Sequence, residues 1–158
     1  MSIKAGNTYG NSITYPRPGI GSVGSYQVAG APYVTGTLPG GGGQLADTEL
    51  QVAFPFVTRR ITVLNLSSNA TIFVHFNSHD PAVAGGSTGA ITGSHYIPLD
   101  SNEDSITMNI KCNELYVTTP PDNAAAATWR VFAELTHIGG GQMYQLTGSG
   151  ATDGPDDP

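Results

Sequence analysis

The sequence predicts an all-β protein: an antiparallel β-sandwich of jelly-roll type with an extended N-terminal arm and a flexible C-terminal tail. Three observations lead to this fold class. Between about residues 48 and 138 apolar and polar side chains alternate with a period of two, and no window has the spacing and caps of an amphipathic helix. Loops rich in Gly, Ser, Asn and Asp separate these short runs, as in a two-layered antiparallel fold. Gly and Pro are concentrated outside this region.

Composition divides the 158 residues into three parts. Residues 1–43 form an extended arm rich in Gly, Pro and Tyr, residues 44–138 form the β-sandwich domain, and residues 139–158 form a tail rich in Gly and Asp. The length suffices for one hydrophobic core of ordinary size but not for two. The arm cannot form a helix or bury much of itself, and the tail is expected to be disordered unless a partner binds it.

Four of the seven tyrosines of the chain lie in the arm. Tyrosine offers a large amphipathic contact area at a small entropic cost, so we expect the arm to lie along a protein surface. The predicted partner-binding residues are Tyr9, Ile13, Tyr15, Ile20 and Tyr26. An alternative for Ser25 to Thr37 is a first strand of the body.

The first half of the body predicts three strands. Residues 50–56 carry Leu, Val and two Phe side chains on one face, and Pro55 places this strand at a sheet edge or marks a bulge. Residues 61–66 are apolar on both sides, as in the middle of a sheet. Residues 72–76 alternate, and the turn signal Ser67-Ser-Asn-Ala precedes them. We therefore expect residues 61–66 and 72–76 to pair as a hairpin.

The second half of the body begins with a long loop, from His79 to Ser94, of a length that is usually functional or mobile. Residues 106–110 then alternate strictly, and residues 115–117 continue the pattern. The closing strand, residues 129–135, places Trp129 on the inward face.

Charge and composition exclude several classes of function. Only 11% of the residues are charged, which is easier to tolerate when neighbouring proteins cover the surface. A net charge of −6 with only six Lys and Arg residues argues against nucleic-acid binding. Neither a membrane-spanning run nor a signal peptide is found, so we expect no membrane partner. The single cysteine, Cys112, cannot form an internal disulfide and is expected to be inert.

No motif supports catalysis, a cofactor or a metal, and the chain is not expected to be an enzyme. His75, His79 and His95 are the candidate metal ligands, but strand residues four apart are about 13 Å apart, so the first two converge only if the chain turns between them. We expect them to be polar loop and strand-end residues. The run Asp100-Ser-Asn-Glu-Asp resembles the start of a calcium loop, yet Ser105 and Lys111 occupy the positions of the required Gly and Glu.

The order of segments in the body resembles small structural proteins of tailed-phage particles. The resemblance covers about Arg60 to Leu135. It rests on Arg60-Ile-Thr-Val-Leu-Asn-Leu-Ser, Thr71-Ile-Phe-Val-His-Phe, His95-Tyr-Ile-Pro-Leu-Asp-Ser-Asn-Glu-Asp-Ser-Ile-Thr, Glu114-Leu-Tyr-Val and Trp129-Arg-Val-Phe-Ala-Glu-Leu. It implies a β-sandwich decoration or cement protein that binds the major capsid protein or other virion proteins. It also implies self-association, with a trimer preferred, and a virion location after synthesis in the host cytoplasm.

Two alternatives remain open at this point. One is another structural position in the same particle, in the neck, tail or baseplate. The other is a carbohydrate- or receptor-binding module, for which Tyr96, Tyr116 and Trp129 are the aromatic residues of the body that could stack on a sugar. The inward position predicted for Trp129 weakens the second alternative.

Overall fold

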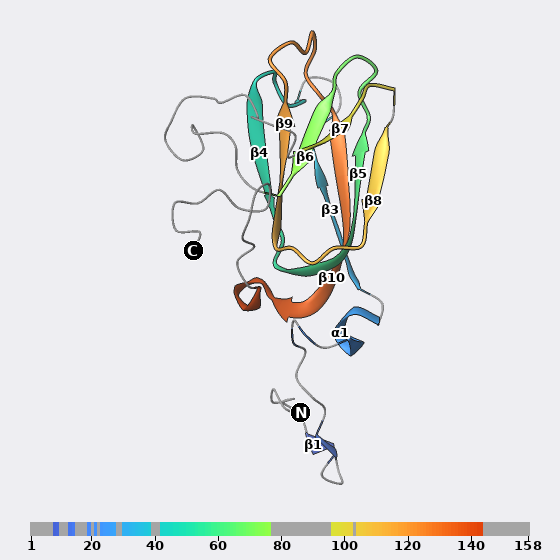
Figure 1. Ribbon diagram of the computed structural model, residues 1–158, viewed down its shortest axis with the longest axis vertical. Helices are drawn as coiled ribbons and strands as arrows, with labels where there is room; N and C mark the ends of the chain where they lie inside the picture. Colours follow the sequence, from blue (N-terminus) through green and yellow to red (C-terminus); the bar gives the residue numbers. More distant parts are fainter. Residues whose placement is uncertain are drawn as a thin grey trace.

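The structure is a computed structural model (Figure 1), and it describes residues 8–9, 13–14, 19, 21, 23–27, 30–38, 42–76, 96–102 and 104–143. Its strands are β1 (Thr8–Tyr9), β2 (Ile13–Thr14), β3 (Ala31–Gly36), β4 (Thr48–Ala53), β5 (Phe56–Asn65), β6 (Ile72–His75), β7 (Ile97–Leu99), β8 (Ser105–Met108), β9 (Glu114–Thr119) and β10 (Trp129–Gly139). Two short helices, α1 (Gly24–Gln27) and the 3₁₀ turn η1 (Gly140–Gln142), complete the described elements. The predicted all-β class is confirmed.

Eight of these strands form two four-stranded antiparallel sheets. The first sheet has the order β3-β10-β5-β8, and the second has the order β4-β9-β6-β7. Along the chain, β3, β4, β5 and β6 alternate between the sheets, β6 and β7 are neighbours in the second sheet, and β8, β9 and β10 alternate again. Most sequence neighbours therefore lie in opposite sheets, as the crossing connections in Figure 1 show.

The facing sides of the two sheets supply one hydrophobic core. The fully buried side chains include Ile61 and Val63 from the first sheet and Val74, Leu115 and Val117 from the second. Each such side chain contributes roughly 2 kcal/mol through removal of apolar surface from water. The inward face predicted for the closing strand is confirmed: the buried residues there are Trp129, Val131, Ala133 and Leu135.

The predicted hairpin of residues 61–66 and 72–76 is wrong, because β5 and β6 belong to different sheets. The buried side chain of Asn65, at the end of β5, holds the chain at this crossing. The two hydrogens on its Nδ2 are shared among the carbonyl oxygens of Ala70, Leu99 and Asp100, at 2.8, 3.0 and 2.9 Å, and its Oδ1 accepts from the backbone N–H of Ser67 at 3.0 Å. The polar segment between the strands thus forms a corner and not a tight hairpin turn.

Residues 50–56 are two elements and not one strand. β4 ends at Ala53 and β5 begins at Phe56, so the chain changes sheets around Pro55, which has no N–H to donate to a ladder. The expected common apolar face is divided as well: Phe54 is buried, whereas Leu50 and Phe56 are 43% and 40% exposed. The expected edge position holds, because β4 is an edge strand of the second sheet.

The range 1–43, expected to be an extended arm, contains regular elements in its described part. The expectation that it forms no helix is wrong for one turn, α1, where the N–H of Tyr26 donates to the Val23 carbonyl at 3.0 Å. The strand alternative holds over β3, which pairs with β10 along its whole length. Gly36 permits this close approach, since a Cβ there would lie 2.2 Å from the Trp129 carbonyl oxygen. The loop expected from His79 to Ser94 and the last residues, 144–158, lie outside the described residues.

Candidate functional site

The outer face of the first sheet is the strongest candidate surface for binding another protein. Strand register fixes which side chains share it, because directly paired residues point to the same side of a sheet. The face consists of Pro32, Val34 and Gly36 from β3, Arg130, Phe132 and Glu134 from β10, Arg60, Thr62 and Leu64 from β5, and Ser105 and Thr107 from β8.

Two apolar side chains stand next to each other on this face. Val34 and Phe132 are direct partners across β3 and β10, and they are 65% and 37% exposed. Leu38, just after β3, is 71% exposed. We call Val34, Phe132 and Leu38 the apolar patch. Adjacent exposed apolar side chains such as Val34 and Phe132 are typical of a protein interaction surface.

The apolar patch lies on and beside a sheet edge. β3 is an edge strand of the first sheet and has the sequence Ala-Pro-Tyr-Val-Thr-Gly, without a charged residue. An edge strand presents backbone N–H and C=O groups that can pair with another strand, and proteins that avoid such pairing usually place charges there. β3 carries no charge, but Pro32 has no N–H to donate, so the part of this edge that can accept an extended segment from a partner begins after Pro32.

The charges on the same face are mostly positive, although the whole chain carries −6. Arg59 Nε lies 3.2 Å from Glu134 Oε2, and Arg60 Nη1 lies 4.0 Å from Glu134 Oε1. The Arg130 guanidinium donates to the carbonyl oxygens of Trp129, at 2.9 Å, and Thr37. Among the described residues, Arg60 and Arg130 on this face, with Arg59 beside them, thus outnumber the Glu134 carboxylate, which favours a partner of neutral or acidic surface.

The predicted partner-binding residues are only partly placed. Tyr26 is half-buried in α1, and Lys111 Nζ lies 4.3 Å from the centre of its ring, so Tyr26 contacts the body of its own chain. Tyr9 and Ile13 are register partners in the two-stranded sheet of β1 and β2. Tyr15 and Ile20 lie outside the described residues.

The outer face of the second sheet differs, because it carries buried polar groups. His75 Nε2 lies 2.7 Å from Thr118 Oγ1 and 3.5 Å from Glu49 Oε2, and the Thr118 hydroxyl donates to the same Glu49 oxygen at 3.3 Å. The Tyr116 ring stacks on His75 with centroids 5.7 Å apart. We call Glu49, His75, Tyr116 and Thr118 the polar cluster. The side chains of His75 and Glu49 are 0% and 1% exposed, so their hydrogen bonds are made within the protein and not with water.

Burial raises the pKa of two side chains on and near the second sheet, Tyr116 and Cys112. Loss of hydration raises the pKa of Tyr116 to about 12, and the neighbouring charge of Glu114 acts in the same direction. Burial likewise raises the pKa of the Cys112 thiol to about 11, although a hydrogen bond with Thr58 opposes the shift. Cys112 is 4% exposed, so both its protonation and its burial work against reaction as a nucleophile.

The candidate metal ligands do not form a site in the described part of the chain. His75 is the last residue of β6, which agrees with the strand-end position expected from the sequence. His79 and His95 lie outside the described residues. The fourth histidine, His137, is exposed on β10. Among the residues that are described, no group of three or more His, Cys, Asp or Glu side chains could hold a metal ion.

The residues proposed for stacking on a sugar are differently placed. Trp129 and Tyr116 are 2% and 7% exposed, so neither offers an accessible ring face. Tyr96 is half-buried and packs against Phe73, with ring centroids 4.2 Å apart.

The sequence alone did not identify Val34 or Phe132 as contact residues. The available signal was a Phe on the outward side of a strand whose inward side was already apolar.

Comparison with other proteins does not extend these assignments. In the described ranges, no helix is both long and apolar enough to cross a membrane. No protein-family model matches the chain, and no curated protein or solved structure is significantly similar to it. Function must therefore be argued from the surfaces themselves.

Proposed function

We propose that the chain is a structural protein of a tailed-phage particle that binds the capsid surface and stabilises it, as a decoration or cement protein does. The observation that carries the proposal is the apolar patch of Val34, Phe132 and Leu38 on and beside the uncharged edge strand β3. Exposed apolar groups at an uncharged sheet edge favour contact with another protein. The major capsid protein or another virion protein is the proposed partner.

We further propose that the two sheets form a jelly roll. The strand orders β3-β10-β5-β8 and β4-β9-β6-β7 support this proposal, because each sheet interleaves early and late strands of the chain. The jelly roll is an architecture of eight strands in two sheets, and it is common among viral capsid proteins. This topology fits the proposed class of function without identifying the binding surface, which rests on the patch.

The arm and β3 would act together in attachment. β3 lies within the arm, after the predicted contact residues, so binding of the preceding part of the arm to the shell would hold the β3 edge next to it. Tyr9, Ile13, Tyr15 and Ile20 would anchor the arm, while Tyr26 fixes α1 against the body through Lys111. Two linked contacts raise the overall affinity because the second binding event becomes intramolecular. Self-association, with a trimer preferred, would multiply this effect.

The first experiment measures whether and where the chain occurs in the particle. Quantitative mass spectrometry of purified particles from the phage that encodes it should give a copy number comparable to that of the capsid subunits. A low copy number in tail or neck fractions would replace the decoration proposal with the neck, tail or baseplate alternative. Absence from the particles would contradict both.

The second experiment tests the surface with point variants of the full chain. Val34→Asp and Phe132→Asp should weaken cosedimentation with particles assembled without the protein by about thirtyfold, since a central apolar contact contributes roughly 2 kcal/mol. Ser105→Asp is the matched control, because it adds the same charge to the opposite edge strand, β8, of the same face. Equal binding by all three variants would exclude the apolar patch as the attachment surface. Deletion of residues 1–24 should separately reduce binding by removing the arm.

A further inference from the structure

A pocket lies at the end of the body where three connections between the sheets meet. It has a volume of about 430 Å³, within the range of small-molecule sites. The three connections are residues 66–71 between β5 and β6, residues 100–104 between β7 and β8, and residues 120–128 between β9 and β10. They lie at the upper end of the molecule in Figure 1, away from α1.

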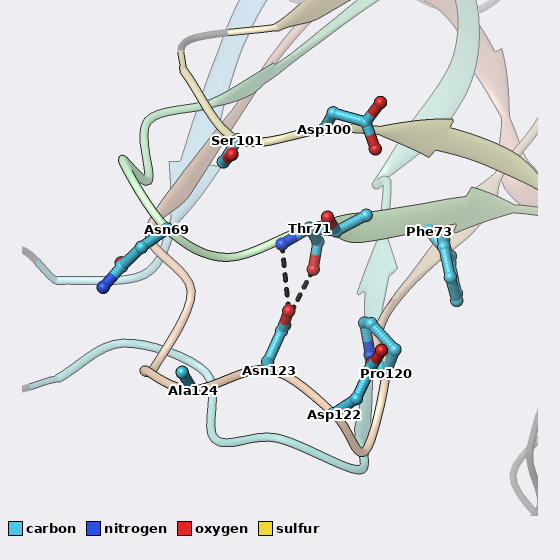
Figure 2. A pocket seen from close by; sticks show the side chains of 9 residues that line it. All are labelled: Asn69, Thr71, Phe73, Asp100, Ser101, Pro120, Asp122, Asn123 and Ala124. Carbon is cyan, nitrogen blue, oxygen red and sulfur yellow. Dashed lines mark hydrogen bonds between the residues drawn. The ribbon is translucent and has the colours of Figure 1, made fainter.

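Hydrogen bonds between the three connections hold the pocket in shape. The carbonyl of Ser67 accepts from the Asn102 N–H at 3.0 Å, and the Ser67 hydroxyl oxygen accepts from the Thr128 N–H at 2.8 Å. Figure 2 shows Asn123 reaching the main chain of Thr71, where its Oδ1 accepts from the N–H at 3.0 Å and its Nδ2 donates to the carbonyl at 2.8 Å. A ligand would therefore meet a preorganised wall, which lowers the entropic cost of binding.

The lining combines hydrogen-bonding groups with one apolar side. Asp100 and Asp122 supply carboxylates, Asn69 supplies an amide and Ser101 a hydroxyl. Asp100, Asp122 and Asn69 are solvent-exposed, so a ligand can reach them. The lining also contains three apolar residues, Phe73, Pro120 and Ala124. In Figure 2, Phe73 and Pro120 lie on the same side of the pocket.

We propose that this pocket binds a neutral sugar unit of a glycan. A pyranose ring presents hydroxyl groups that donate to carboxylates and amides, and a face of C–H groups that packs on an aromatic ring. Asp100 and Asp122 accept hydroxyl protons, while Phe73, supported by Tyr96 at 4.2 Å between ring centroids, provides the apolar contact. The two exposed carboxylates and the lack of Lys, Arg and His in the lining disfavour phosphorylated or acidic ligands.

This inference does not depend on the virion proposal. It concerns the pocket and not the apolar patch, and it is tested on the isolated full-length chain. The chain labelled with ¹⁵N is titrated with methyl glycosides of mannose, glucose, galactose and N-acetylglucosamine. Amide signals of the three connections, including those of Asn69, Ser101 and Ala124, should shift with at least one of these probes. Shifts confined to other regions, or none with any probe, would overturn the proposal.

Matched variants separate recognition from folding. Asp122→Asn should weaken the responding probe by about tenfold, since an acceptor-only carboxylate is replaced by an amide of the same shape. Phe73→Leu should also weaken it, by removing the ring. Glu114→Gln, at the other end of β9 from the pocket and outside its lining, makes the same change of charge and should bind as the unaltered chain does. Equal affinity of all variants, with spectra that show each to be folded, would contradict the proposal.

Discussion

The outer faces of the two sheets differ in the side chains that they expose and bury. The inner faces are both apolar and share one core. On the first sheet the outer face leaves Val34 and Phe132 exposed beside paired charges, whereas the outer face of the second sheet buries Glu49, His75 and Thr118 in mutual hydrogen bonds. An exposed apolar group is tolerated by a stable fold, but a buried polar group must find its partners within it.

This difference separates residues that serve folding from residues available for binding. Loss of a buried hydrogen-bonding partner leaves other polar groups unsatisfied, at a cost of about 1–3 kcal/mol each. Loss of an exposed apolar side chain changes the folding free energy little. We therefore expect stability to depend strongly on the second sheet and on the crossing between the sheets, and weakly on the outer face of the first.

The largest effect is expected at the crossing, for Asn65→Ala. Three carbonyl oxygens and the Ser67 N–H lose their partner, so the free energy of unfolding should fall by about 4 kcal/mol. Urea denaturation measures the change. Asn109→Ala, at an exposed position, is the control and should change stability by less than about 0.5 kcal/mol. Similar losses for the two variants would show that Asn65 does not hold the two sheets at this corner.

The next effect compares two histidines on opposite sheets. His75→Ala should destabilise the chain by about 3 kcal/mol, because it leaves a cavity and removes the imidazole that contacts Thr118 and Glu49. His137→Ala removes an identical but exposed side chain from β10 and should change stability by less than about 0.5 kcal/mol. A small effect at His75 would mean that the polar cluster is not structural, and the contrast between the two outer faces would fail.

How much of this contrast the sequence predicts depends on the kind of residue. A period of two identifies the inward residues of strands such as β10, because burial of apolar groups is a local pattern. It does not identify pairing partners: residues 61–66 and 72–76 have the pattern of a hairpin. In the structure β6 instead pairs with β7 and β9, and long-range hydrogen bonds join Asn65 to Leu99 and Asp100 at the crossing. The lining of the pocket could not be predicted from the sequence either, since it comes from three connections distant in sequence.

A smaller effect is expected from the ionisation of Cys112. The thiol has a pKa near 9.0 when exposed and about 11 in the fold, so the unfolded chain ionises first as the pH rises. Below pH 9 the thiol is protonated in both the folded and the unfolded chain. As the pH rises from 9 to 11, the free energy of unfolding should fall by about 2 kcal/mol, because only the unfolded chain ionises readily. The destabilisation caused by Cys112→Ala should therefore be smaller at pH 11 than at pH 9 in urea denaturation. An equal difference at both values would contradict burial as the cause of the raised pKa.

The smallest effect on stability is expected from Phe132→Thr, on the outer face of the first sheet. The side chain is already 37% exposed, and threonine fits a β-strand, so the free energy of unfolding should change by less than about 1 kcal/mol. The same variant should lose affinity for the proposed capsid partner, because the contact with Val34 that forms the patch disappears. Measuring unfolding and particle binding on one preparation distinguishes the two roles. A large loss of stability would place Phe132 with the structural residues and remove the main reason to regard this face as the binding surface.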